Sequence, residues 1–194
     1  MNDTYKKFMQ ISICVSIFIF ILFAIFNISK IASFYYSYLY VNLVQLLLSI
    51  IGKTLSATTI FMFLFNKWLW KVPPIKLLHD IPILNKKYSG VFISDYDNQQ
   101  RTAEVMIEQT FLSISIKYKT GESYSNSIVA SFVNVHNTKY LVYTYHNVPN
   151  ADIQDNSPIH YGTTIFNVDN IHVLEGNYFT GRKTKGSIKV EAVE

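Results

Sequence analysis

The chain has 194 residues, a formal charge of +4, 49% hydrophobic residues and 15% charged residues. Its 14 Phe and 14 Tyr exclude an intrinsically disordered chain, and its single cysteine excludes a disulfide scaffold. The positive charge lies wholly in the first 80 residues, which hold seven lysines and two acidic residues, while the remainder is nearly neutral. Bulk charge therefore does not support a groove for a nucleic acid polymer, and we expect no such partner.

Two long apolar runs predict two transmembrane helices. Residues 9–28 carry no charge, and residues 41–65 are interrupted only by the polar stretch 52–54. At ~1.5 Å per residue, about 20 residues cross the ~30 Å hydrocarbon core. The first run exceeds the apolar region of a signal peptide and has no convincing cleavage site after it, which favours a permanent anchor over a cleaved signal.

Lysines and aromatic residues flank these runs in a pattern that predicts topology. Lysines cluster before the first run and after the second, and the positive-inside rule then places both termini in the cytoplasm. The lysines are Lys6 and Lys7 before, Lys67, Lys71 and Lys76 after, and only Lys30 between, in what we expect to be a short external hairpin. Aromatic side chains suited to the membrane interface border the runs at Tyr35, Tyr36, Tyr38, Tyr40, Trp68 and Trp70.

Polar and small residues recur at steps of three and four along the second run, which places them on one helix face. We call this set the polar seam: Asn42, Gln45, Ser49, Gly52, Lys53, Ser56 and Thr59. One interpretation is that the seam packs the two helices of one hairpin together. A second is that it lets several copies associate, with Lys53 facing an aqueous or defect region, and a third is a simple tether with a snorkelling lysine.

From residue 88 onward, strand signals replace helical periodicity. The predicted strands cover 88–94, 102–109, 111–119, 123–135, 140–146, 159–166, 173–179 and 186–193. Short sequential hairpins favour an eight-stranded up-and-down antiparallel β-barrel over a sandwich, and a barrel of this size holds side chains or one small ligand. The expected organisation is a two-span transmembrane region at 1–72, a linker at 73–87 whose prolines end the second helix, and a barrel domain at 88–194.

The barrel sequence shows no motif for catalysis or metal binding. Its histidines form no close pair, and Glu104 and Glu108 share a strand face that we interpret as solvated. The sequence also lacks a phosphate-cradling glycine loop and a nucleophile elbow. We therefore expect a protein that is not an enzyme and that needs no metal and no cofactor.

Three strand ends are polar and aromatic where a core strand would carry Val or Ile. The residues are Tyr143, Tyr145, His146 and Asn147, then His160, Tyr161, Gly162, Thr163 and Thr164, then Tyr178, Thr180, Arg182 and Thr184. Aromatic faces stack nucleobases, and Arg binds phosphate bidentately. The residues alone leave two readings open, a nucleotide-binding site or ordinary packing at the barrel rim beside a solvated basic turn.

Several stretches resemble one family over nearly the full length of the chain. They are LHDIPIL from Leu78, EQTFLSISIKYKTGES from Glu108, YLVYTYHNVP from Tyr140, HYGTTIF from His160 and EGNYFTGRKTKGSI from Glu175. They are similar to the SMODS-associated two-transmembrane β-strand-rich effectors of CBASS antiphage systems, which are CD-NTase-associated proteins. The segment from Tyr140 to Ile188 is the most specific, whereas the spans match only in number and position.

The resemblance implies a cyclic dinucleotide made by a partner nucleotidyltransferase, oligomerisation on binding, and disruption of the bacterial inner membrane that kills the infected cell. By position in the matching stretches, we expect the ligand-binding residues to be Tyr145, Asn147, His160, Thr163, Tyr178, Arg182 and Thr184. Arg182 would bind phosphate, Tyr145 and Tyr178 would stack or line the pocket, and Thr163, Asn147 and Thr184 would form hydrogen bonds. Alternatives are a membrane-anchored barrel that binds another small ligand without disrupting membranes, and a constitutive pore.

Overall fold

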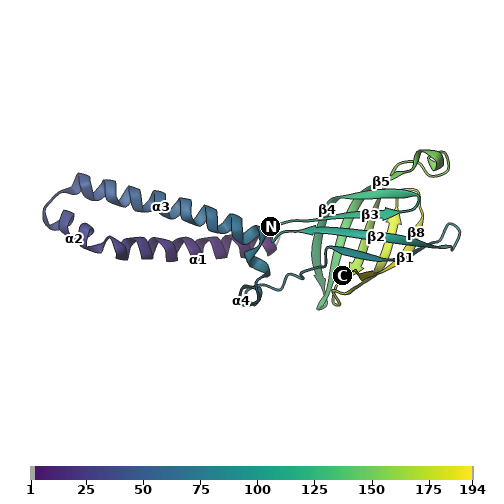
Figure 1. The fold of residues 1–194 in the computed structure, drawn as a ribbon, viewed down its shortest axis with the longest axis horizontal. Helices are drawn as coiled ribbons and strands as arrows, with labels where there is room; N and C mark the ends of the chain where they lie inside the picture. The colour runs from purple at the N-terminus through teal and green to yellow at the C-terminus, as the bar shows by residue number, and fades with distance from the viewer. Residues whose placement is uncertain (1–2, 194) are drawn as a thin grey trace. The chain divides into compact units, whose positions relative to one another are not determined.

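A computed structural model describes residues 3–193. The chain divides into two compact units, with the boundary between His79 and Asp80. The first unit is helical and the second is a β-barrel (Figure 1). The division falls inside the stretch 73–87 that the sequence predicts as a linker.

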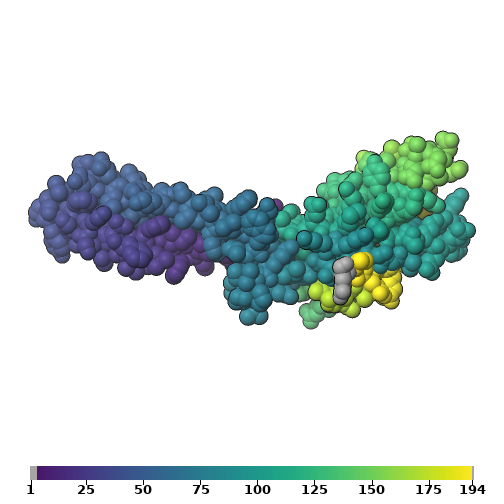
Figure 2. Space-filling view, in the orientation of Figure 1, coloured from purple at the N-terminus to yellow at the C-terminus, as the bar shows by residue number. Residues whose placement is uncertain are grey.

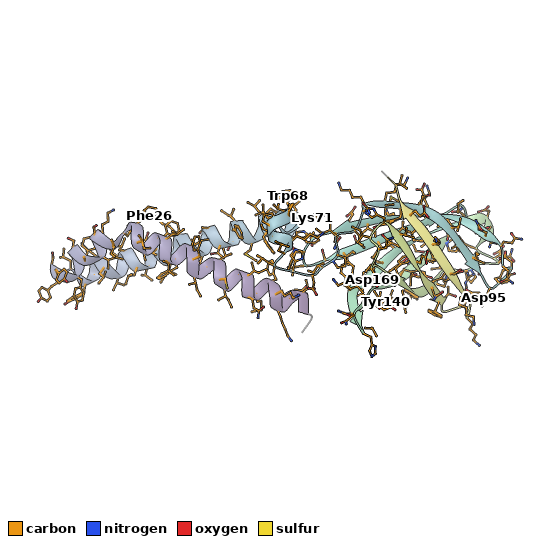
Figure 3. All side chains as sticks on the ribbon, turned by 90° about the horizontal axis from the view of Figure 1, so that it is seen from below. Phe26, Trp68, Lys71, Asp95, Tyr140 and Asp169 are labelled. Carbon is orange, nitrogen blue, oxygen red and sulfur yellow. The ribbon has the colours of Figure 1, made fainter. Side chains whose placement is uncertain are left out.

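The helical unit is a hairpin of two long helices, α1 (Asp3–Phe26) and α3 (Tyr40–Lys67), joined through α2 (Ile28–Tyr36). The stretches Thr4–Phe26 and Tyr40–Lys67 are long and apolar enough to cross a membrane, which indicates membrane anchoring. Phe26 lies toward one end of the hairpin, and Trp68 and Lys71 lie at the other (Figure 3).

The connection between the long helices is more ordered than the short hairpin that the sequence suggests. No Gly or Pro interrupts residues 28–36, so the chain stays helical through α2 and then reverses at Tyr38, whose φ is 58°. The amide of Leu39 donates to the carbonyl of Phe34 and that of Tyr38 to Tyr35, the pair of bonds that closes a Schellman motif. Tyr38 occupies the left-handed position that glycine usually takes.

The end of α3 also differs in detail from the expectation. The helix ends at Lys67, before the prolines, and continues as a 3-10 turn, η1 (Leu69–Lys71). Pro73 and Pro74 begin a short further helix, α4 (Pro73–Lys76), because the fixed φ of proline suits a first helical turn.

The polar seam of α3 does not face the rest of the helical unit. The packed face of α3 carries Ile50, Thr54, Thr58, Met62 and Phe65, spaced by three and four. All seven seam residues are exposed on other faces of the helix. The interpretation that the seam packs the two helices of one hairpin is therefore wrong, and the seam is left open toward whatever surrounds the hairpin.

The second unit is the eight-stranded up-and-down barrel that the alternation predicts. Every strand pairs antiparallel with its sequence neighbours, and β1 pairs with β8 to close the sheet. The strands are β1 (Lys87–Ser94), β2 (Gln100–Gln109), β3 (Ile114–Thr120), β4 (Ser123–Val135), β5 (Thr138–Pro149), β6 (His160–Asn167), β7 (Val173–Thr180) and β8 (Lys185–Ala192).

The third and fifth strands differ most from the sequence prediction, for local reasons. The third strand begins at Ile114 because Phe111–Ser113 form a turn, in which the Ser113 amide donates to the Thr110 hydroxyl at 3.0 Å. The fifth strand is longer at both ends. It begins after His136 and Asn137, whose positive φ values make a tight hairpin, and it stays paired with β4 as far as Pro149.

The barrel interior is divided along its axis. One end, near Asp169, is filled by buried apolar side chains including Leu84, Leu141 and Phe166. Asp95 lies at the other end (Figure 3), where the β1–β2, β3–β4, β5–β6 and β7–β8 connections gather because the strands alternate in direction. The long β5–β6 loop at this end, drawn in light green, projects from the barrel (Figure 2). The polar–aromatic strand ends of the sequence therefore converge at one end of the barrel.

Tyr88→Phe should destabilise the barrel, because its hydroxyl ties three segments together at the filled end. Tyr88 is fully buried, and its Oη donates to the Ile171 carbonyl at 2.7 Å and accepts from the Asn85 amide at 2.9 Å. Removing it leaves the Asn85 backbone amide without its partner and the Ile171 carbonyl with only the bond from Asn85 Nδ2 at 3.1 Å. The loss costs about 1–3 kcal/mol of the free energy of unfolding. Urea denaturation of the full chain in detergent micelles, followed by tyrosine circular dichroism, measures the loss.

Tyr118→Phe is the matched control. The Tyr118 hydroxyl is also buried but has no hydrogen-bond partner among the described residues. Its removal should leave the stability unchanged or raise it. Equal losses in the two variants would contradict the role assigned to the Tyr88 hydrogen bonds.

Candidate functional site

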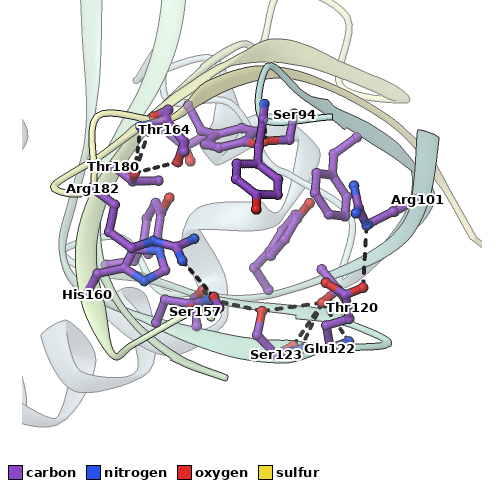
Figure 4. A pocket seen from close by; sticks show the side chains of 18 of the residues that line it. Ser94, Arg101, Thr120, Glu122, Ser123, Ser157, His160, Thr164, Thr180 and Arg182 are labelled. Atoms are coloured by element: carbon purple, nitrogen blue, oxygen red, sulfur yellow. Dashed lines mark hydrogen bonds and ion pairs between the residues drawn. The ribbon is translucent and has the colours of Figure 1, made fainter. Parts of the chain in front are cut away.

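The unfilled end of the barrel holds a cavity of about 690 Å³ (Figure 4). This volume lies within the ~300–1,000 Å³ typical of small-molecule sites. Side chains from all eight strands and from the four connections at this end, β1–β2, β3–β4, β5–β6 and β7–β8, line it: Phe92, Ser94, Tyr96, Arg101, Tyr118, Thr120, Glu122, Ser123, Ser125, Tyr143, Tyr145, Asn147, Ile153, Asn156, Ser157, His160, Thr164, Tyr178, Thr180, Arg182, Thr184 and Ile188.

Aromatic rings form the deeper part of the cavity wall. Phe92 lies edge-on to Tyr118 and to Tyr178, with ring centroids 6.1 and 6.3 Å apart, and Tyr143 lies 5.8 Å from Tyr145. Burial raises the pKa of all four tyrosines above the ordinary value, so their hydroxyls stay neutral. The wall therefore offers ring faces together with neutral hydroxyl groups to a ligand.

Gly162 makes room for one of these rings. It pairs with Tyr145 across β5 and β6, and a Cβ at residue 162 would lie 2.3 Å from Tyr145 Oη. Any larger residue at 162 would displace the Tyr145 ring, so the inward position of this ring requires glycine there.

Six of the seven predicted ligand-binding residues line this cavity. They are Tyr145, Asn147, His160, Tyr178, Arg182 and Thr184. The seventh, Thr163, points to the outer face of β6, where its hydroxyl lies 3.3 Å from that of Thr144, and Thr164 takes the inward position. The register of β6 decides this, because adjacent residues of a strand point to opposite faces.

Arg182 reaches across the mouth of the cavity from the β7–β8 turn. Its Nη1 donates to Ser157 Oγ at 2.8 Å, which connects it to the β5–β6 loop (Figure 4). The same loop is held from the other side by Asn150, whose amide donates to the Glu122 carbonyl at 2.8 Å. The guanidinium is exposed and has no acidic partner among the described ion pairs, so it is available to an anion.

His160 stands beside Arg182 at the mouth. Burial is the main cause that lowers the pKa of its imidazole, and the positive charge of Arg182 adds to the effect, while a 2.8 Å contact with the Pro158 carbonyl opposes it. The imidazole is therefore neutral at pH 7. An anionic ligand at Arg182 would raise this pKa and favour proton uptake.

The cavity holds a second arginine, Arg101, that was not among the residues predicted from the sequence. Arg101 lies at the start of β2, where Nη1 and Nη2 both donate to the Asp97 carboxylate and Nε lies 3.5 Å from Glu122 Oε1. The hydrogen bonds from Arg101 lower the pKa of Asp97 to about 2. In the sequence, the spacing of Asp97 and Arg101 across a turn could have predicted that these two residues pair. The spacing does not show that the arginine faces the barrel interior.

Asn147 is held by two serines on the neighbouring strand. Its Nδ2 donates to Ser123 Oγ at 3.0 Å and to Ser125 Oγ at 2.8 Å. Neither serine stood out in the sequence, because their inward orientation depends on the pairing of β4 with β5. The two bonds engage both amide hydrogens, so the carbonyl oxygen is the side-chain group of Asn147 that remains for a ligand.

Comparisons with known proteins agree with this geometry. Residues 79–192 match the family described as Cap15, cyclic dinucleotide receptor domain. A CD-NTase-associated protein 15 from Staphylococcus schleiferi is 28% identical over 148 residues, 76% of this chain and 81% of the relative. Another, from Yersinia aleksiciae, is 30% identical over 149 residues, 72% of this chain and 71% of the relative. The chain therefore belongs to the Cap15 family of CBASS effectors, which carry a cyclic dinucleotide receptor domain.

Proposed function

We propose that the barrel cavity binds one cyclic dinucleotide, and that binding makes the helical units of several copies associate and disrupt the membrane. The observation that carries the proposal is the cavity itself, which combines an exposed guanidinium at its mouth with a wall of tyrosine rings. A cyclic dinucleotide presents the matching groups, two phosphates and two bases. Stacking on aromatic rings contributes about 1–3 kcal/mol per base.

The cavity residues divide by chemistry into three roles. Arg182 binds a phosphate, because its guanidinium is exposed at the mouth. Tyr145 and Tyr178 provide ring surface for the bases. Hydrogen bonds come from Asn147, His160, Thr164 and Thr184. Thr164 takes the role that the sequence assigned to Thr163, because Thr164 is the one that lines the cavity.

The exposed polar seam supports association in the membrane. Polar side chains in hydrocarbon lack partners unless they face another helix or water, so Asn42, Gln45 and Ser49 favour contact with a second copy. Lys53 then faces a water-filled or defect region between copies, where its charge is hydrated. A ligand can drive this step only by binding the assembled state more tightly than the unassembled state. A difference of about 5.5 kcal/mol in binding free energy shifts the ratio of assembled to unassembled protein from 1:99 to 99:1.

The cellular setting follows from the same proposal. The protein lies in the bacterial inner membrane with both termini and the barrel in the cytoplasm, as the lysine distribution favours. A partner nucleotidyltransferase supplies the ligand during infection, and membrane disruption kills the cell before phage matures.

The proposal is tested with the full chain in vesicles of E. coli polar lipids that contain a trapped fluorescent dye. A panel of cyclic dinucleotides is added, and binding, dye release and the chemical state of the ligand are measured. We expect saturable binding to at least one cyclic dinucleotide, dye release that depends on it, and recovery of the ligand unchanged.

Other outcomes separate the alternatives. Binding without release would support a membrane-anchored receptor that does not disrupt membranes. Release without any ligand would support a constitutive pore. Binding to no member of the panel would overturn the assignment of the cavity.

A further inference from the structure

The charged side chains that line the cavity are segregated. Figure 4 shows Arg182 and His160 on one side and Arg101 and Glu122 on the other. The first side is cationic or neutral. On the second side, the lining residues Arg101 and Glu122 carry opposite charges, and Asp97, which does not line the cavity, already pairs with Arg101. The charge of Glu122 is therefore the one left without a full counter-charge.

Arg101 is not free to bind a phosphate. Two of its nitrogens are already bound to Asp97, so the arginine is paired before a ligand arrives. The contact with Glu122 is longer, 3.5 Å, and uses only Oε1. Glu122 can therefore turn to a ligand and leave Arg101 paired.

Glu122 is presented to the cavity from a fixed backbone. Its amide donates to the Thr120 hydroxyl at 3.1 Å, and its carbonyl accepts from the amide of Asn150 at 2.8 Å. The side chain is 58% exposed, and no second partner for the carboxylate is found among the described residues. An acceptor with a free oxygen thus lies at the edge of a cavity that we propose to bind an anion.

A free carboxylate opposes the binding of an anion unless it contacts a part of the ligand that donates hydrogen bonds. Phosphates and ribose ring oxygens only accept, so the donors of a cyclic dinucleotide are its hydroxyls and its bases. Guanine offers two adjacent donors on its Watson–Crick edge, the N1–H and the 2-amino group, which match the two oxygens of one carboxylate. Hypoxanthine keeps the N1–H but lacks the amino group, and uracil offers one N–H between two carbonyls.

We propose that Glu122 is a specificity-determining residue that reads the Watson–Crick edge of a guanine base in the bound cyclic dinucleotide. This inference rests on the proposed function, because it assigns a base contact to the side of the same cavity that lies opposite Arg182. The ligand lies with one phosphate at Arg182 and with a donor-rich base toward the turn that carries Glu122.

The test compares two ligands that differ by the 2-amino group alone, 3′,3′-cyclic di-GMP and 3′,3′-cyclic di-IMP. Dissociation constants are measured by isothermal titration on the full chain in detergent micelles. A good bidentate contact is worth about 1–3 kcal/mol of discrimination, so we expect the wild type to prefer cyclic di-GMP by about tenfold or more. Glu122→Gln should reduce that preference to about twofold, since the amide replaces one acceptor with a donor.

Glu108→Gln is the matched control, because Glu108 is an exposed carboxylate on the outer face of β2. It should keep the wild-type preference. If Glu122 only neutralises Arg101, Glu122→Gln will change both dissociation constants by the same factor, and the inference is overturned. It is also overturned if the chain binds a cyclic dinucleotide without guanine in preference to both probes, while the proposed function then still stands. Failure to bind any cyclic dinucleotide would overturn the proposed function itself.

Discussion

Arg182→Ala should abolish ligand-dependent membrane disruption while the protein still folds and inserts. The guanidinium is exposed at the mouth, so its removal leaves no buried group without a partner. A hydrogen bond to a charged group contributes about 1.5–3 kcal/mol, and its loss weakens binding by roughly 10- to 150-fold. Isothermal titration of the full chain and dye release from vesicles measure the two effects.

Two control variants show whether the effect of Arg182→Ala comes from the guanidinium itself, from any nearby positive charge or from the lost hydrogen bond to Ser157. Lys185→Ala removes an exposed cation at the start of β8 and should bind as the wild type does. Ser157→Ala removes the hydroxyl that Arg182 contacts but keeps the guanidinium, so it should change affinity much less than Arg182→Ala. Dye release by Arg182→Ala at the wild-type ligand concentration, or without ligand, would count against the proposed gating.

Lys53→Leu should eliminate membrane disruption without weakening ligand binding. A lysine at the centre of a span costs about 2.5–3.5 kcal/mol on insertion, so leucine makes insertion more favourable. A loss of dye release therefore cannot be attributed to failed insertion. Chemical crosslinking in vesicles should show fewer ligand-induced oligomers, because the seam loses the charge that requires a hydrated surface between copies.

Thr54→Val provides the comparison for Lys53→Leu. Thr54 lies on the packed face of α3, and its hydroxyl donates to the Ile50 carbonyl within the same helix. Valine has nearly the same shape, so this variant should release dye as the wild type does. If Lys53→Leu released dye at the wild-type rate with the wild-type ligand dependence, association along the polar seam would have to be abandoned.

The barrel and the helical unit expose polar groups in different places, because one is proposed to bind a ligand and the other to associate in a membrane. The barrel keeps its guanidinium and one carboxylate accessible inside a closed sheet, where strand pairing fixes their separation. The helical unit leaves its polar seam accessible on the outside of a hairpin. These two sets of exposed groups are the basis of the proposal that ligand binding in the barrel changes the membrane. The proposal requires no catalytic step.

Much of the architecture could be predicted from the sequence, because it depends on local patterns. Apolar runs of membrane length predicted α1 and α3, and period-two alternation predicted eight strands and a closed barrel. Side chains such as Val105 and Ile107 are buried as their alternation indicates. The cluster of polar and aromatic strand ends also predicted where a ligand cavity would lie, because connections at one end of an up-and-down barrel must converge.

Only the tertiary structure decided which face each residue presents and which residues meet across the cavity. A shift of one residue in register exchanges Thr163 for Thr164, and no local pattern within that threonine pair fixes the choice. The seam of α3 could be assigned to lipid or to α1 only once the packed face was known. Arg101 and Glu122 come from different hairpins, and they meet because β2 pairs with β3 in the register that sets Ala103 opposite Thr120. Closure of the eight strands into one ring then places Glu122 on the other side of the cavity from Arg182.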